Sequence, residues 1–172
     1  MAVGGRSYTG APSRRKAKAL CEFNGGIVKG SCLCGEIEYE ISEFNGNIYQ
    51  CHCSLCRKQG GSASNTGAIV PLNRLHWLKG QANVRTWVKS TGFTSSFCQS
   101  CGSLVPNVLR ELDYYWVPVG ALDDGAFKVV ANIYLDSKAS WATVSSSGGR
   151  FEAMPVLDEF LNLLDVGLHG QK

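Results

Sequence analysis

The sequence lacks any long run of apolar residues. No stretch approaches the roughly 20 residues that a transmembrane helix needs, and residues 1–25 contain no apolar run of signal-peptide length. We therefore expect neither a membrane segment nor secretion, and we assign the protein to the cytoplasm. The sequence also lacks internal repeats and an interdomain linker. Its 172 residues are thus expected to form one folded domain with a hydrophobic core.

Acidic residues are absent from the first 21 positions. Five of the 17 basic residues precede the first acid, Glu22, which leaves 12 bases against 14 acids in the rest of the chain. We interpret residues 1–25 as a flexible basic N-terminal tail and residues 26–172 as the folded domain. A transit peptide is the alternative interpretation of the tail. Five scattered bases attract a polyanion only weakly, so we expect no nucleic-acid partner.

Alternation of apolar and polar residues predicts a mainly β protein built from antiparallel sheets. The clearest strand covers residues 35–41, where Ile37, Tyr39 and Ile41 face one side and three glutamates face the other. Turn sequences such as Asn45-Gly46 separate it from later strands. Those further strands are predicted over residues 48–53, 82–89, 94–98, 104–109, 114–119 and 129–135.

Residues 155–168 follow a different periodicity. Their apolar residues recur at helical spacing: Leu157, Phe160, Leu161, Leu164 and Leu168. Pro155 near the start, and Asp158 and Glu159 in the first turn, are typical of a helix N-terminus. The pattern predicts one amphipathic C-terminal helix that packs on the sheets.

Cysteine is the one residue type that is unusually frequent, with eight in the chain. Seven of the eight lie in three clusters: Cys32-x-Cys34, Cys51-His52-Cys53-x-x-Cys56 and Cys98-x-x-Cys101. Cytosolic thiols stay reduced, so this clustering indicates metal binding rather than disulfides. The short spacings let two thiolates from one turn reach one zinc ion at about 2.3 Å. Gly35 and Gly102, which follow two of the clusters, leave the backbone free to curl around an ion.

Seven cysteines divide into a set of four and a set of three. Two dyads make a closed four-cysteine site, which is typical of structural zinc. The triad makes a site with an open fourth position, which is typical of catalytic zinc. Other groupings, and a purely structural role for both sites, remain alternatives.

Two other residues are alternatives for the fourth ligand of the triad. In an extended chain His52 points away from its two flanking cysteines. Cys21 lies in the tail, has no partner at metal-binding spacing, and is interpreted as a free thiol.

Three segments resemble the signature of a known family. They are Gly30-Ser31-Cys32-Leu33-Cys34-Gly35, Cys51-His52-Cys53-Ser54-Leu55-Cys56-Arg57 and Phe97-Cys98-Gln99-Ser100-Cys101-Gly102. The sequence resembles the glutathione-dependent formaldehyde-activating enzymes, a family that includes centromere protein V, over about residues 26–142. The resemblance implies a β-tent fold with two zinc ions per chain. It implies a structural zinc on Cys32, Cys34, Cys98 and Cys101 and a catalytic zinc on Cys51, Cys53 and Cys56.

The resemblance further implies a zinc-dependent carbon–sulfur lyase, of the S-(hydroxymethyl)glutathione synthase type, whose substrates are a thiol such as glutathione and an aldehyde such as formaldehyde. Ligand chemistry favours the same function. Three thiolates give zinc a net charge of about −1, which suits holding a substrate thiolate better than activating water.

Other interpretations of the site are kept. Arg57 and Lys58 could offset the negative charge of the triad or meet substrate carboxylates. The alternative functions are a zinc-stabilised binding module, which would use the tail or residues 114–116, and a zinc enzyme of the same scaffold with another small-molecule substrate.

Overall fold

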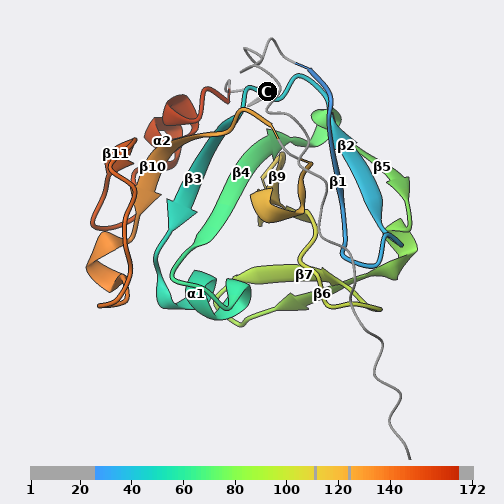
Figure 1. Cartoon of the computed structure of the whole chain (residues 1–172), viewed down its shortest axis with the longest axis horizontal. Helices are drawn as coiled ribbons and strands as arrows, with labels where there is room; N and C mark the ends of the chain where they lie inside the picture. The colour runs from blue at the N-terminus through green and yellow to red at the C-terminus, as the bar shows by residue number, and fades with distance from the viewer. Residues whose placement is uncertain (1–25, 111, 124, 167–172) are drawn as a thin grey trace, which may run out of the picture.

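The structure, a computed structural model, describes residues 26–110, 112–123 and 125–166. In these residues the chain forms three β sheets and two α helices, so the prediction of a mainly β protein is confirmed (Figure 1). None of the described helices has the length and apolar character needed to cross a membrane. The predicted basic tail, with Cys21, lies outside the described residues, as does Leu168.

The largest sheet has six strands in the order β11-β10-β3-β4-β9-β8. Its strands are β3 (Asn47–Cys51), β4 (Asn65–Pro71), β8 (Asn107–Val108), β9 (Tyr114–Pro118), β10 (Lys128–Ile133) and β11 (Gly149–Arg150). We predicted mostly antiparallel strands, and the exceptions are in this sheet, where β10 pairs in parallel with both β3 and β11. The other pairs of this sheet are antiparallel.

Two smaller antiparallel sheets complete the β structure. The first has the order β1-β2-β5, and the second pairs β6 with β7. Their strands are β1 (Val28–Ser31), β2 (Glu38–Ile41), β5 (Leu75–Lys79), β6 (Val84–Val88) and β7 (Thr94–Cys98). The predicted alternation in β2 is confirmed, because Ile37, Tyr39 and Ile41 are fully buried.

Of the two α helices, the sequence predicted only one. The predicted C-terminal helix is present as α2 (Leu157–Leu163), and it buries Phe160 and Leu161. Helix α1 (Ser54–Gly60) was not predicted, and none of its side chains is buried. Short 3-10 helices cover Leu72–Arg74, Gln81–Asn83, Val119–Ala121 and Leu135–Ser137.

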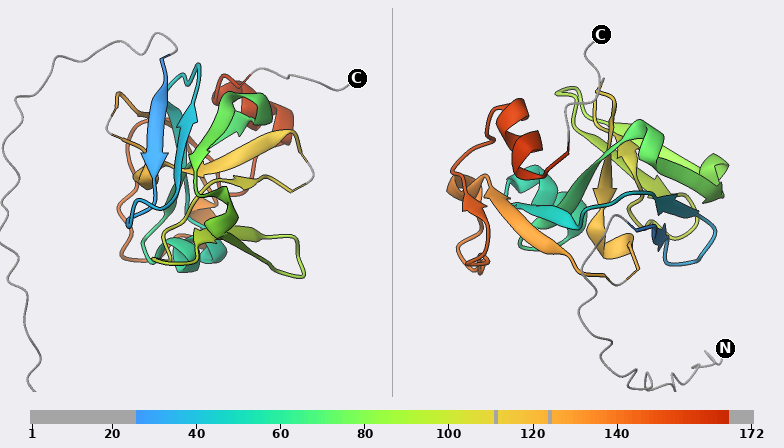
Figure 2. Two further views of the ribbon diagram at one scale, coloured as in Figure 1. Left: turned by 90° about the vertical axis from the view of Figure 1, so that its right-hand side faces the viewer. Right: turned by 90° about the horizontal axis from the view of Figure 1, so that it is seen from above.

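The central sheet separates two hydrophobic cores. Along β4, Ala68 and Val70 pack into the first core with β1 and β2, whereas Ile69 packs into the second core with α2. Figure 2 shows α2 and the β1–β2 hairpin on opposite sides of the central strands. The first core contains Cys32 and Cys98, and the second contains Cys51. Each cysteine cluster therefore belongs to a different core.

Candidate metal centres

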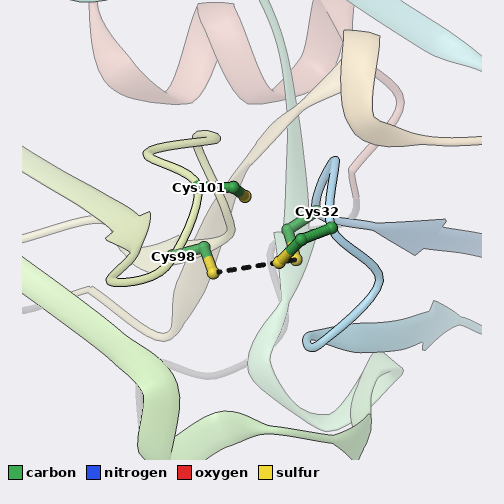
Figure 3. A group of neighbouring side chains, drawn as sticks. Cys32, Cys98 and Cys101 are labelled. Atoms are coloured by element: carbon green, nitrogen blue, oxygen red, sulfur yellow. Dashed lines mark hydrogen bonds between the residues drawn. The ribbon is translucent and has the colours of Figure 1, made fainter. Parts of the chain in front are cut away.

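The first cluster joins two loops that are distant in sequence. Cys32 and Cys34 lie between β1 and β2, while Cys98 ends β7 and Cys101 lies in the turn that follows. Their sulfur atoms all lie within 4.8 Å of one another. Figure 3 shows Cys98 and Cys101 approaching Cys32 from the opposite side of the cluster. The structure thus brings together the four residues of the predicted closed site.

The sulfur spacing of this cluster fits a tetrahedral metal ion. The Sγ atoms of Cys32 and Cys34 are 3.5 Å apart, and those of Cys34 and Cys98 are 3.8 Å apart. Four sulfurs placed 2.3 Å from a tetrahedral zinc ion would be about 3.8 Å apart. Both of these distances are close to that spacing.

Each of the two loops turns at a glycine with a left-handed backbone conformation. Gly35 and Gly102 each follow the second cysteine of a dyad, and each has a φ of 74°, which is in the left-handed region. The N–H of Gly35 donates to the carbonyl of Cys32, and that of Gly102 donates to the carbonyl of Cys98. An added Cβ would meet nothing within 4 Å at either glycine. The requirement for glycine is therefore one of conformation and not of space.

Ser103 links the two halves of the four-cysteine cluster. Its Oγ accepts a hydrogen bond from the backbone N–H of Leu33 at 3.0 Å and lies 3.3 Å from the Sγ of Cys101. Hydrogen bonds with the side chain and backbone of Ser103 lower the pKa of Cys101 to about 6. A thiol that ionises near neutral pH is prepared to bind a cation.

The second cluster is built at the junction of β3 and α1. Cys51 is the last residue of β3, Cys53 is the N-cap of α1, and Cys56 lies in the first turn of that helix. The three sulfur atoms lie within 4.8 Å of one another. The backbone N–H of Cys56 donates to the Sγ of Cys53 at 3.4 Å. The short helix therefore holds two of the three sulfurs in a fixed relation.

The electrostatics of the second cluster favour one negative charge, at Cys53, because the pKa values of Cys51 and Cys56 are raised. Hydrogen bonds from the thiols of Cys51 and Cys56 lower the pKa of Cys53 to about 2. The same contact with Cys53 raises the pKa of Cys51 to about 12. One thiolate is thus stabilised by two thiol donors, and a cation that replaces the two protons would be bound by all three sulfurs.

Within the described part of the chain, no fourth ligand joins this triad. The group of side chains that could share an ion contains the three cysteines and not His52. His52 is only 1% exposed, and neither of its ring nitrogens has a hydrogen-bond partner among the described residues. Burial lowers its pKa. The three cysteines therefore have no fourth protein ligand among the described residues.

The two basic residues after the triad differ in their contacts. The Nε atom of Arg57 donates to the carbonyl of His52 at 3.2 Å, and its Nη2 atom donates to the carbonyl of Ser137 at 3.3 Å. Lys58 is exposed on α1. Arg57 thus binds backbone carbonyls, and the interpretation of this residue as a partner for substrate carboxylates has no support in its contacts.

Two tyrosines near the triad were not predicted as site residues. Burial raises the pKa of Tyr49 and of Tyr134, and the negative charge of Cys51 raises both further. Both hydroxyls therefore stay protonated at neutral pH and can donate hydrogen bonds. Tyr134 also has a φ of 58°, which is rare for a residue with a side chain and is often found at functional sites.

Comparison with known proteins supports the resemblance. The family model described as glutathione-dependent formaldehyde-activating enzyme matches residues 27–137. The chain belongs to this family. The matched region includes both cysteine clusters, whereas helix α2 lies beyond it.

Matches to individual proteins are few. One solved structure that matches is the crystal structure of a Rhodobacter sphaeroides protein, whose sequence is 29% identical to this chain. The match covers 55% of this chain and 87% of that chain, with a TM-score of 0.47. Among curated proteins, no match was found.

Proposed function

We propose that the protein is a zinc-dependent enzyme of the carbon–sulfur lyase type, which adds a thiol to an aldehyde or releases it. Glutathione and formaldehyde are the proposed substrates. The observation that carries this proposal is the group of three thiols at Cys51, Cys53 and Cys56, which lacks a fourth protein ligand among the described residues. The family to which the chain belongs is named for glutathione and formaldehyde.

The proposal assigns two zinc ions to each chain. The four cysteines of the first cluster would hold a structural ion, and the triad would hold the second. When bound to the triad, zinc supplies an open coordination position at which a thiol sulfur is held as the thiolate. The four-cysteine cluster has no such position, because its four sulfurs complete the usual tetrahedral set.

The proposed reaction makes or breaks one carbon–sulfur bond. The sulfur bonds to the carbonyl carbon of formaldehyde, the π electron pair of the carbonyl moves to its oxygen, and the thiol proton ends on that oxygen. Tyr49 and Tyr134 keep protonated hydroxyls beside the triad, and we assign them to hydrogen bonding with the aldehyde oxygen. In the reverse direction the same hydroxyls would bind the oxygen as the carbonyl forms again.

The test combines metal content with reaction rate. Zinc and iron per chain are measured by elemental analysis on protein purified without a chelator. The exchange between glutathione, formaldehyde and their adduct is followed by NMR. We expect two zinc ions and an exchange rate above that of buffer alone. Zinc-loaded protein that neither binds thiols nor changes this rate would contradict the proposal.

One observation weighs against the binding-module alternative. Tyr114 and Trp116 are 7% and 8% exposed, so that the segment 114–116 belongs largely to the core and offers little binding surface. A panel of thiols and aldehydes in the same assay separates the proposed substrates from other small molecules. The proposal retains a single zinc domain over residues 26–172 and a cytoplasmic location.

A further inference from the structure

A cavity of about 130 Å³ lies against the triad, and Cys56 forms part of its wall. Its lining comes from β3, α1, the β6–β7 turn, the β8 segment and β9. Residues that matter for its chemistry are Gln59 of α1, Phe93 of the β6–β7 turn, Asn107 and Arg110 of the β8 segment, and Trp116 of β9. Figure 1 shows α1 beside the β6–β7 hairpin, which closes this end of the molecule. We call this space the Cys56 cavity.

A larger cavity of about 710 Å³ lies beside the four-cysteine cluster. It is lined by Cys32, Leu33 and Ser103, and it also reaches Asn65 and Thr66 of β4 and Gly60 of α1. None of the three triad cysteines lines it, whereas Cys56 lines the smaller cavity.

Two polar groups in the wall of the Cys56 cavity have no ion-pair or hydrogen-bond partner among the described residues. Arg110 takes part in neither of the two ion pairs found among the described residues, which join Arg74 to Glu43 and Lys79 to Glu38. Asn107 is only 7% exposed, and its Oδ1 atom is buried without a hydrogen-bond partner among the described residues. A buried acceptor without a partner is destabilising, so its retention favours a ligand that donates to it.

The backbone around these groups is also unusual. Arg110 has a φ of 56°, in the left-handed region that disfavours a side chain. Such conformations cluster at ligand-binding and catalytic sites, where surrounding contacts maintain them. The left-handed backbone of Arg110 and these two polar groups thus lie in one short segment, residues 107–110, of the wall of the Cys56 cavity.

We propose that the Cys56 cavity binds the carboxylate-bearing end of a glutathione-like thiol, with Arg110 pairing the carboxylate and Asn107 Oδ1 accepting an amide N–H of the same ligand. This inference rests on the proposed function, because that function places the sulfur of the ligand at the triad. A volume of about 130 Å³ is below the roughly 300 Å³ of pockets that enclose a whole ligand. One end of the thiol fills the cavity, and its sulfur remains at the cysteines.

The test measures binding of S-methylglutathione, which has both carboxylates but no free thiol. Affinity is measured by calorimetry on the zinc-loaded full chain. Arg110→Gln is expected to weaken binding at least about tenfold, because a charge-assisted hydrogen-bonded pair is lost. Arg110→Lys should retain part of the affinity. Arg85→Gln, a matched change at an exposed arginine that lines none of the described cavities, should leave it unchanged.

A second variant tests the amide contact. Asn107→Asp is nearly isosteric and places a negative charge beside the proposed carboxylate, so we expect a further loss of S-methylglutathione binding. Its melting temperature is measured in parallel to show that it is folded. If wild-type protein does not bind S-methylglutathione, or if Arg110→Gln binds it as well as wild type does, the assignment of the cavity is wrong.

Comparison with unmodified glutathione separates this inference from the proposed function. S-methylglutathione binding could depend on Arg110 while glutathione binds no more tightly than S-methylglutathione does. That result would confirm the ligand assigned to the cavity and contradict the role of the triad in holding the thiol. If glutathione binds wild-type and Arg110→Gln protein equally and tightly, the triad holds the thiol and the cavity assignment fails.

Discussion

The guanidinium of Arg57 donates to the backbone carbonyl of His52 at 3.2 Å and so connects the first turn of α1 to the end of β3. This contact spans the triad, because His52 lies between its first two cysteines and Arg57 directly follows its third. A second bond from Arg57 to the carbonyl of Ser137 fixes the same helix to the segment after β10. Arg57 therefore helps to fix the position of Cys56 relative to Cys51.

We predict that Arg57→Ala weakens zinc binding at the triad by about 10–100-fold, the usual effect of losing a group that orients metal ligands. Zinc at the four-cysteine cluster should be unaffected. The measurement is competition with a chromophoric chelator, which releases the two ions in separate phases. Lys58→Ala, at an exposed position on the same helix, is the control. Equal losses in both variants would show that charge rather than position matters.

The two clusters should respond differently to loss of a cysteine. Cys98→Ser removes a proposed zinc ligand that is buried in the first core, so we expect a loss of at least about 3 kcal/mol in the free energy of unfolding. Cys53→Ser removes a half-buried member of the triad, the proposed catalytic zinc site, and should abolish the exchange activity with a smaller loss of stability. Urea unfolding and the NMR exchange assay give the two readouts. Similar destabilisation by both changes would indicate that the triad is structural.

Replacement of the two loop glycines should destabilise the protein through backbone strain alone. Gly35→Ala and Gly102→Ala each place a side chain at a φ of 74°, which costs about 1–2 kcal/mol. Gly120→Ala is a matched control, because an added Cβ there also meets nothing within 4 Å and its φ is not positive. The measurement is the free energy of unfolding in urea. If all three variants lose the same stability, strain is not the cause.

Gly67 on β4 allows close approach of an aromatic ring. An added Cβ would overlap the indole nitrogen of Trp116, which lines the Cys56 cavity. We therefore expect Gly67→Ala to cost about 1–3 kcal/mol of stability and to weaken S-methylglutathione binding by moving this ring. Calorimetry and thermal melting measure the two effects. Gly60→Ala, where the nearest contact would be an ordinary 3.6 Å, should show neither effect.

Elements with a local signal were predictable from the sequence. Strand β7 was predicted with the bounds that the structure has, and β2 was found from its strict alternation. Strand β4 was missed because both of its faces are buried, one in each core. Ala68, Ile69 and Val70 are therefore all apolar, and no polar residue alternates with them. Helix α1 was missed because a seven-residue helix without buried side chains has no apolar period.

The same distinction applies to the site. Both cysteine groups could be predicted because each ligand pair is two or three residues apart, within the reach of one turn. Asn107 and Arg110 could not be predicted, because only the pairing of β8 with β9 brings their segment to the triad. The left-handed φ of Arg110 has no sequence signature. The parallel pairing of β10 with β3 likewise depends on tertiary contacts between distant segments.

The sulfurs of Cys34 and Cys98 come together from positions 64 residues apart in the sequence, and they join two small sheets that share no ladder of strand pairing. An ion that joins such distant segments acts as a cross-link. Its loss would increase the entropy of the open chain and release the β6–β7 hairpin before the rest of the molecule unfolds. We therefore expect the lifetime of this protein in a cell to follow zinc supply, since a released hairpin is a substrate for proteases.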